Sequence, residues 1–510
     1  MYSSKTEKTG FKKVNRKNRA VEIADTFEWI ITAFILALVF RAFVMEAYRI
    51  PTGSMADTLK GAHFRLCCPQ CGYKYDHGFV QHEYGLPPDA VPRGNVQLPR
   101  TRCPICGHYQ PTAIAIPVAN GDRILVLKCL YQFLEPKRWD VIVFKNPLDP
   151  TINYIKRLTG LPGETVEIID GDIYINGQIS RKPHKVQNEL WMPIYDNDYQ
   201  PVRPGERSFN GHAWQQPFKN IEDSKWKISR DNPTKFFLDG PAGQTSSLIY
   251  DTSIGNDFRA TYAYDSVREY EYLPYCSDLM VRFYAQSAEP QDRIGIELSK
   301  YQTRYKAWVD FGYEMVIEKT TEDGKTTELA RKSIMPPATN KPTLVKFANV
   351  DHRLIFQFGH EKLTHDLGRS PDDAGQGKTS LQPQVKIFGS GKLTLSHVAI
   401  FRDIHYIAAK FAGGPKSSRA VEGNPFTLGK DEFFVLGDNS PNSADSRWWR
   451  REGIGNNGIF YREGIVPRDY LVGKALFVYW PSGFKLSARD PIGIVPNVGQ
   501  IRFIYGGSPR

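Results

Sequence analysis

The chain has 510 residues, of which 41% are hydrophobic, 24% charged and 13% aromatic, a composition typical of folded proteins. Because this length exceeds what one ordinary hydrophobic core supports, two or three globular units are expected. The net charge is +11, but the first 20 residues contain seven basic groups and one acidic group, which leaves +5 for the rest. The body of the chain is therefore nearly balanced. This excludes a general nucleic-acid-binding surface, and we expect no nucleic-acid partner.

An apolar segment follows the basic arm, and it is the only candidate for a membrane span. Residues 27–45 are apolar apart from Glu28 and Arg41, which lie near the two ends, where long side chains can reach the interface. We predict a basic cytoplasmic tail over 1–25 and a single-pass anchor over 26–45. Basic residues before an apolar run keep the N-terminus in the cytoplasm, so the rest would lie on the exported side of the cell (inner or plasma) membrane.

Two other interpretations of this segment are a cleaved signal peptide and a buried helix of a soluble protein. No small-x-small cleavage site follows the apolar run, which argues against the first. The concentrated basic arm argues against the second.

Past the anchor, the sequence predicts a mainly β fold. Residues 166–179 contain two alternating runs with Asp-Gly and Asn-Gly turn signals. Residues 191–420, hereafter the insert, are rich in aromatic residues and in short strand-like runs, which predicts an inserted antiparallel β-sandwich or jelly roll. The spacing of these runs resembles concanavalin-like lectin and glucanase sandwiches. Such a fold does not by itself establish sugar binding, so a glycan or a protein partner for the insert stays open.

Four segments, in order along the chain, contain the groups that a Ser–Lys protease needs: a hydroxyl, an amine that is neutral at rest, and donors for an oxyanion. Singly, each segment is explained by an ordinary turn, strand or polar loop. The segments are IPTGSMADTL at 50–59, GDRILV at 121–126, YIKRLTGLPGE at 154–164 and GDNSPNSADSR at 437–447.

Together they resemble the conserved boxes of type I signal peptidases, over about residues 27–60, 115–190 and 421–505. Thr52, Asp57 and Glu164 depart from the common family residues, but no required group is lost. The resemblance implies a signal-peptidase-type β catalytic domain in two parts, 46–190 and 421–510. The implied site residues are Ser54 as nucleophile, Lys156 as general base, Thr52 and the Ser54 N–H as oxyanion donors, Ser443 to orient the Lys156 amine, Asp445 and Arg447 as a supporting ion pair, and Tyr48, Ile50 and Ile155 lining the substrate pockets.

The residues around Lys156 suggest how its amine could be neutral. Apolar neighbours disfavour an ammonium group, and a nearby cation such as Arg157 could act in the same direction. The sequence therefore predicts a lowered pKa for Lys156.

The implied function is that of a membrane-bound serine endopeptidase that cleaves signal peptides from exported precursors, with precursors and membrane lipid as partners and no cofactor for catalysis. One alternative is a soluble Ser–Lys self-cleaving repressor, which requires a DNA-binding head and no anchor. Another is a membrane-tethered carbohydrate-binding protein built on a non-catalytic protease frame.

Four of the seven cysteines form two Cys-x-x-Cys turns within residues 62–112, hereafter the cysteine module. Two such turns can complete a tetrahedral site, so the module resembles a zinc ribbon, and we predict structural zinc. Disulfides are the alternative, because an exported region meets an oxidising compartment. The predicted ligands are Cys68, Cys71, Cys103 and Cys106, whereas Cys67, Cys129 and Cys276 are expected to be ordinary residues.

Overall fold

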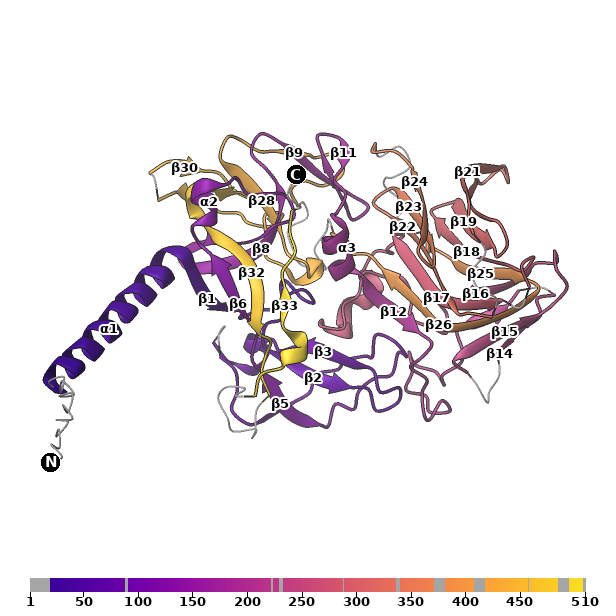
Figure 1. Cartoon of the computed structure of the whole chain (residues 1–510), viewed down its shortest axis with the longest axis horizontal. Coiled ribbons are helices and arrows are strands. Elements are labelled where there is room, and N and C mark those ends of the chain that lie inside the picture. The colour runs from indigo at the N-terminus through magenta and orange to yellow at the C-terminus, as the bar shows by residue number, and fades with distance from the viewer. Residues whose placement is uncertain are drawn as a thin grey trace, which may run out of the picture.

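The structure is a computed structural model that describes residues 19–87, 90–221, 223–228, 233–287, 289–335, 340–370, 381–407, 418–456, 458–484 and 495–507. The first 18 residues of the predicted cytoplasmic tail lie outside this described part. Figure 1 shows helix α1 (Arg19–Val39) projecting from one end of the molecule, the sheets of the predicted catalytic domain (hereafter the catalytic sheets) and the cysteine module next to it, and the insert at the far end. The predicted mainly β fold with one N-terminal apolar helix is confirmed.

The N-terminal helix stands clear of the rest of the protein. After α1 the chain makes one π-helical turn, Phe40–Val44, and then enters the first strand directly. The span Val21–Val44 is long and apolar enough to cross a membrane. Its large apolar side chains are exposed, for example Trp29 at 76% and Phe34 at 65%, so it is not a buried helix of a globular core. An apolar helix with this much exposed surface requires lipid or a partner to cover it.

The largest catalytic sheet has eight antiparallel strands from both parts of the domain. They are β1 Met45–Arg49, β6 Arg123–Leu127, β7 Val141–Asn146, β8 Asp149–Gly160, β28 Glu432–Leu436, β31 Val466–Pro467, β32 Leu471–Trp480 and β33 Arg502–Phe503. Their spatial order is β1-β6-β32-β7-β8-β28-β31, with β33 on β32. Since β32 lies between β6 and β7, the C-terminal part completes a sheet begun by the N-terminal part. Alternate residues such as Ile124 and Val126 are buried in a shared hydrophobic cluster.

A smaller sheet adjoins it, with the order β11-β10-β9-β27. Its strands are β9 Thr165–Ile169, β10 Asp172–Ile175, β11 Gln178–Ile179 and β27 Phe426–Thr427. The predicted turns Asp170-Gly171 and Asn176-Gly177 have positive φ at both residues, as tight hairpins of this type require. Val166 of β9 and Phe433 of β28 pack in one core, which again joins the two parts of the catalytic domain.

The cysteine module and the strand that follows it, β5, form a four-stranded sheet with the order β3-β2-β5-β4. The strands are β2 His63–Cys67, β3 Lys74–Gly78, β4 Asn95–Gln97 and β5 Ala115–Ala119. Phe64 and Val118 are fully buried in its core together with Cys103, so the thiols lie inside a small hydrophobic cluster.

The insert is built from two antiparallel sheets that share one apolar core. The first sheet has the order β14-β15-β26-β17-β22-β23-β24, with β12 on β26, and the second has β13-β16-β25-β18-β19-β20-β21. The strands are β12 Met192–Asp196, β13 Phe218–Asn220, β14 Trp226–Ile228, β15 Lys235–Asp239, β16 Ser246–Tyr250, β17 Leu279–Ser287, β18 Arg293–Lys300, β19 Thr303–Asp310, β20 Glu314–Thr320, β21 Thr326–Ser333, β22 Thr343–Val350, β23 Arg353–Phe358, β24 Glu361–Asp366, β25 Val385–Ser390 and β26 Lys392–Arg402.

The other described elements are short. The α-helices α2 Leu130–Phe133 and α3 His184–Leu190 are followed later in the chain by a two-stranded sheet of β29 Gly453–Ile454 and β30 Phe460–Tyr461. The 3-10 turns are Gln81–Tyr84, Val267–Tyr272, Ser440–Asn442, Arg468–Tyr470 and Val498–Gln500.

Candidate active site

Ser54 lies in an irregular loop that leaves β1 and covers residues 50–62, hereafter the nucleophile loop. Asp122 closes this loop at both ends. The Ile50 N–H donates to the Asp122 carbonyl at 2.8 Å, and the Lys60 N–H donates to Asp122 Oδ2 at 3.1 Å. The neighbouring Gly121 has to be glycine, because a Cβ there would lie 1.8 Å from the Ile50 carbonyl oxygen. The Gly-Asp segment predicted to enter a strand therefore fixes the base of the nucleophile loop.

Lys156 lies in the middle of β8 and reaches the serine. Its Nζ is 2.7 Å from Ser54 Oγ and donates to its neighbour's carbonyl, Ile155 O, at 3.0 Å. The ring of Tyr154 lies 5.2 Å from the same nitrogen. Lys156 is only 3% exposed. The structure thus brings together, within hydrogen-bonding distance, the two side chains predicted to be nucleophile and base.

The surroundings of Lys156 make its amine easy to deprotonate. Burial lowers the pKa of Lys156 to about 8. The carboxylates of Asp445 and Asp438 oppose this effect, and the guanidinium of Arg447 adds to it. Desolvation is the dominant cause, as expected for an ammonium group taken out of water.

The predicted contribution of Arg157 to this pKa is wrong. Successive residues of a strand point to opposite faces, so Arg157 points away from Lys156. It is fully buried and paired in a bidentate manner with Asp438, with both nitrogen–oxygen distances at 2.7 Å. The cation that does act on Lys156 is Arg447, which comes from a distant part of the sequence.

The loop at 437–447 supplies a rigid support behind the base. Arg447 and Asp445 form the predicted ion pair, which is fully buried and bidentate, with Nε–Oδ1 at 2.9 Å and Nη2–Oδ2 at 2.7 Å. Arg447 also donates to the Ser440 hydroxyl at 2.8 Å. The loop at 437–447 is thus held by two buried bidentate ion pairs, Arg447–Asp445 and Arg157–Asp438, which restrict its movement.

Ser443 does not make the hydrogen bond predicted for it. Its Oγ is buried and has no hydrogen-bond partner in the part of the chain that the structure describes. A Cβ on Gly437 would lie 2.2 Å from this Oγ and 2.4 Å from the Ser54 carbonyl oxygen, so Ser443 packs beside the backbone of the nucleophile loop. The amine of Lys156 instead makes its contacts with Ser54 and Ile155.

The predicted oxyanion donors face outward. Thr52 is exposed, and among the described residues neither its hydroxyl nor the Ser54 N–H takes part in a hydrogen bond. Tyr48, Ile50 and Ile155 belong to one hydrophobic cluster, with Ile50 buried and the other two half-buried. The structure therefore brings the three predicted pocket residues together, and Ile155 is adjacent in sequence to Lys156.

Two residues of the fourth segment, Asp438 and Asn439, contact the site although no role was predicted for them. Asp438 neutralises Arg157, and the Asn439 N–H donates to the Ser54 carbonyl at 3.1 Å. Both lie within the Gly-Asp-Asn run that the segment begins with, but nothing in that run indicates which distant group each one meets.

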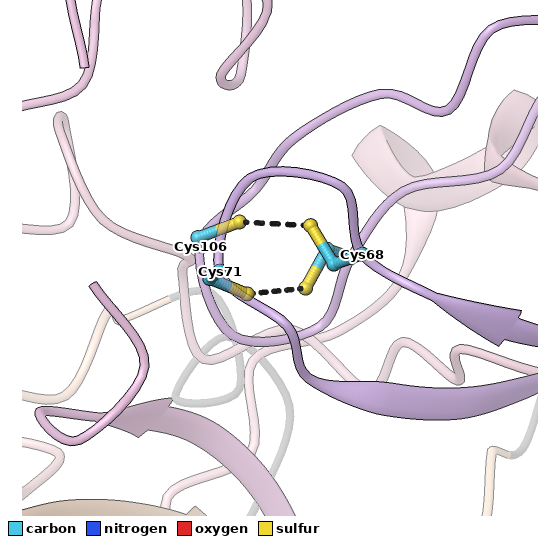
Figure 2. Close-up of side chains that lie close together, drawn as sticks. Cys68, Cys71 and Cys106 are labelled. Carbon is cyan, nitrogen blue, oxygen red and sulfur yellow. Dashed lines mark hydrogen bonds between the residues drawn. The ribbon is translucent and has the colours of Figure 1, made fainter. Parts of the chain in front are cut away.

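The four cysteines predicted as metal ligands converge in the cysteine module, and Figure 2 labels three of them, Cys68, Cys71 and Cys106. Cys68 Sγ lies 3.6 Å from Cys106 Sγ, and Cys71 Sγ lies 3.7 Å from Cys103 Sγ. All four sulfurs lie within 4.8 Å of one another. A tetrahedral site with Zn–S bonds of about 2.3 Å places its sulfurs about 3.8 Å apart, whereas a disulfide requires about 2.05 Å. The observed sulfur separations therefore match those of a zinc site and exceed the length of a disulfide bond.

A family model described as "Signal peptidase, peptidase S26" matches residues 112–215 and 408–480. The signal peptidase I of Rickettsia canadensis (strain McKiel) is 30% identical over 151 residues, which cover 29% of this chain and 42% of that protein. The signal peptidase I of Rickettsia prowazekii (strain Madrid E) is 30% identical over 163 residues, covering 32% and 46%. The chain thus spans less than half the length of these relatives.

Among solved structures, the carbohydrate binding module CBM66 from Bacillus subtilis covers 36% of this chain and 95% of its own, with 12% identity and a TM-score of 0.24. Sheep galectin-11 covers 25% and 92%, with 10% identity and a TM-score of 0.19. Scores this low support no inference about fold or ligand.

The two segments matched by the family model lie on either side of residues 216–407, which form most of the insert, and they contain Lys156 and the loop at 437–447. Strands from both segments share the catalytic sheet and its core. Over these two segments the chain is similar to signal peptidases of family S26.

Proposed function

We propose that the protein is a membrane-anchored serine endopeptidase that removes signal peptides from exported precursor proteins. The observation that carries this proposal is the separation of 2.7 Å between Ser54 Oγ and the buried amine of Lys156. A base must lie within about 3.2 Å of the proton-bearing atom, and its pKa should be close to the working pH. Both requirements are met with a pKa of about 8.

In the proposed reaction, the neutral Lys156 amine takes the proton from the Ser54 hydroxyl as Oγ attacks the scissile carbonyl carbon. The resulting oxyanion is held by the Ser54 N–H and the Thr52 hydroxyl. The protonated amine then gives its proton to the leaving peptide nitrogen, and the C–N bond breaks. Lys156 next takes a proton from water as the water oxygen attacks the acyl carbon. The bond between that carbon and Ser54 Oγ then breaks, the Lys156 ammonium returns the proton to Oγ, and the signal peptide leaves with a free carboxyl group that ionises in water.

An extended substrate has a sheet edge to bind to. β1 is the terminal strand of its sheet, so its outer edge has no partner among the described strands. β8 pairs with β28 only over 157–160. The edge of β8 that faces β28 therefore has no partner among the described strands near Ile155. Main-chain pairing with such edges, with alternate side chains in pockets, is a common way to bind extended peptides. Tyr48, Ile50 and Ile155 would then contact the small residues before the cut.

The proposed anchor is the span Val21–Val44, with the N-terminus in the cytoplasm and the catalytic domain on the exported side. This orientation is supported by the basic residues that precede the span. Because β1 begins at Met45, directly after the helix, the catalytic sheet would lie near the membrane surface, where precursors emerge.

We also propose that Cys68, Cys71, Cys103 and Cys106 hold a structural zinc ion. Four thiolates leave no open coordination position, so the ion would stabilise the module and take no part in peptide cleavage. The support is the sulfur geometry described above.

The test is cleavage of a signal-peptide-bearing precursor by the purified full chain in detergent or lipid vesicles. Ser54→Ala and Lys156→Ala should each reduce cleavage to background, whereas Lys235→Ala, which changes an exposed lysine of the insert, should leave it unchanged. Cleavage by Ser54→Ala at the wild-type rate would contradict the proposal. That result would favour the alternative of a membrane-tethered binding protein on a non-catalytic protease frame.

A further inference from the structure

A short segment of the insert, residues 262–265, lies against the catalytic loops although it is far from them in sequence. In Figure 1 the insert and the catalytic sheets meet along the region below α3. Tyr262 and Tyr264 are 2% and 4% exposed. They form a small buried cluster with Ala56 of the nucleophile loop and with Met192. A side chain of the insert therefore reaches a position two residues from Ser54.

Tyr264 packs on the glycine next to the nucleophile. A Cβ on Gly53 would lie 2.2 Å from Cε1 of the Tyr264 ring, so the ring lies directly on the backbone at this position. The Tyr264 hydroxyl donates to the Ala62 carbonyl at 3.0 Å, and the Tyr264 carbonyl accepts the Gly78 N–H at 2.8 Å. One side chain thus contacts both the start and the end of the nucleophile loop, and its backbone joins the cysteine module.

Tyr262 and Asp265 make the corresponding contacts with the loop behind the base. The Tyr262 hydroxyl donates to the Asp438 carbonyl at 3.0 Å. The Asn439 side-chain amide donates to Asp265 Oδ1 at 2.7 Å, and the Asn439 N–H donates to the Ser54 carbonyl at 3.1 Å. The segment therefore contacts two loops, and those loops are themselves hydrogen-bonded at the backbone of Ser54.

We infer that Tyr262, Tyr264 and Asp265 are positioning residues, through which the insert completes the protease site by holding the nucleophile loop against the loop at 437–439. This inference rests on the proposed function. None of the three side chains touches the reacting atoms, so each would act through Gly53, Asp438 or Asn439.

The nucleophile loop needs such external support because it has little regular structure of its own. Within it, the Ala56 N–H donates to the Gly53 carbonyl at 3.0 Å and the Leu59 N–H to the Met55 carbonyl at 2.7 Å. The turns are short, and Gly53 allows many backbone conformations. A displacement of about 1 Å between reacting groups can reduce the rate about 100-fold. The ring of Tyr264 fills the space into which the backbone at Gly53 could otherwise relax.

The test compares the kinetics of precursor cleavage for three variants of the full chain. Tyr264→Ala removes the ring, and we expect kcat to fall by about tenfold or more with KM within about twofold, since substrate contacts are unchanged while the attack geometry is lost. Tyr264→Phe keeps the ring and should restore kcat to within about threefold of wild type. Tyr250→Ala is the matched control: Tyr250 is also a buried tyrosine of the insert, and its hydroxyl also donates to a backbone carbonyl at 3.0 Å, that of Asn256.

Thermal unfolding of each variant is measured in parallel, so that loss of the fold is distinguished from loss of geometry. A folded Tyr264→Ala with wild-type kcat would overturn the inference, as would a folded Tyr250→Ala with the same fall in kcat. If Tyr264→Ala does not fold, Tyr262→Phe and Asp265→Ala replace it, and wild-type kcat in both would overturn the inference. A wild-type chain that does not cleave precursors refutes the proposed function instead, so the two failures are distinguishable.

Discussion

At the scale of single residues, the site depends on two adjacent basic side chains with opposite surroundings. Lys156 and Arg157 follow one another on β8 and are both buried. Arg157 is neutralised by Asp438, whereas Lys156 has a serine hydroxyl and a carbonyl as its hydrogen-bond partners. An arginine stays protonated in proteins, so it requires a carboxylate, while a lysine responds to burial by releasing its proton more easily.

The first prediction concerns the pH dependence of cleavage. In the proposed mechanism the neutral form of Lys156 is the active one, and burial lowers its pKa to about 8. We therefore expect kcat/KM to rise about tenfold per pH unit below pH 8 and to level off above it. The measurement is kcat/KM for a model precursor between about pH 6 and 10.

Lys156→Arg serves as the control for this profile, since its guanidinium cannot act as a base and should be inactive throughout the range. A wild-type kcat/KM that keeps rising up to the ordinary pKa of a free lysine would show that burial does not lower the pKa of Lys156.

The second prediction concerns the Arg157–Asp438 pair. Both side chains are fully buried, so Asp438→Asn would leave the guanidinium without a counter-charge. Breaking such a pair by removing one partner costs about 3–5 kcal/mol of folding free energy. Glu135→Gln, which removes a 78% exposed partner of Arg468, should cost about 0–1 kcal/mol. Urea unfolding of both variants measures the difference, and equal effects would contradict the prediction.

At the scale of elements, α3 (His184–Leu190) contains a carboxylate in an unfavourable position. Glu189 is half-buried, and its Oε2 makes no hydrogen bond among the described residues. Burial raises the pKa of Glu189 to about 7, although Arg157 acts in the opposite direction. The helix thus places an acidic group close to the buried pair behind the catalytic base.

The third prediction follows from this raised pKa. Between the ordinary pKa of 4.5 and about 7, the folded protein binds a proton at Glu189 that the unfolded chain has released, so stability falls as the pH rises through this interval. Glu189→Gln removes the free-energy cost of ionising this buried carboxyl group. We expect its unfolding temperature to exceed that of wild type by a few degrees at pH 8, with the difference disappearing near pH 4.5. Glu83→Gln, at an exposed position, should show no such trend, and a constant difference at all pH values would contradict this account.

The elements also show which parts of the structure the sequence could predict. The boxes around Ser54 and Lys156 are contiguous runs, and the turns at Asp170-Gly171 and Asn176-Gly177 depend on local backbone preferences. These features were predictable because their causes are local. The pairing of β27 with β9 and the contact of Tyr264 with Gly53 depend on how distant segments pack, and no local pattern indicates such packing. The prediction that Arg157 acts on the pKa of Lys156 was wrong for this reason, because its partner Asp438 lies 281 residues away in the sequence.

At the scale of the whole molecule, the insert is joined to the catalytic domain by buried charges. Lys300 of β18 forms ion pairs with Asp278 at 2.6 Å and with Asp172 of β10 at 3.8 Å. Lys182, which precedes α3, pairs with Asp351 and Asp403 of the insert. These side chains are at most 7% exposed. Buried ion pairs of this kind demand good geometry, so they restrict how the insert can sit on the protease.

The cysteine module is the third part of this assembly, and the last prediction concerns its metal. The purified chain should contain about one zinc ion per molecule by elemental analysis, because four thiolates complete a tetrahedral site. Cys103→Ser should lose the metal and lower the unfolding temperature, since binding of structural zinc is coupled to folding. Cys129→Ser, which changes a half-buried cysteine outside the cluster, should keep the zinc content and the unfolding temperature of wild type.

Removal of the metal should also affect cleavage, although the ion takes no part in the chemistry. The module holds the Gly78 N–H and the Ala62 carbonyl against Tyr264, which in turn packs on Gly53. A strong chelator should therefore reduce kcat together with the folded signal of the module, and added Zn²⁺ should restore both. A metal-free chain with four disulfide-bonded cysteines in mass spectrometry, or a chelated chain with unchanged stability, would contradict the structural role assigned to the ion.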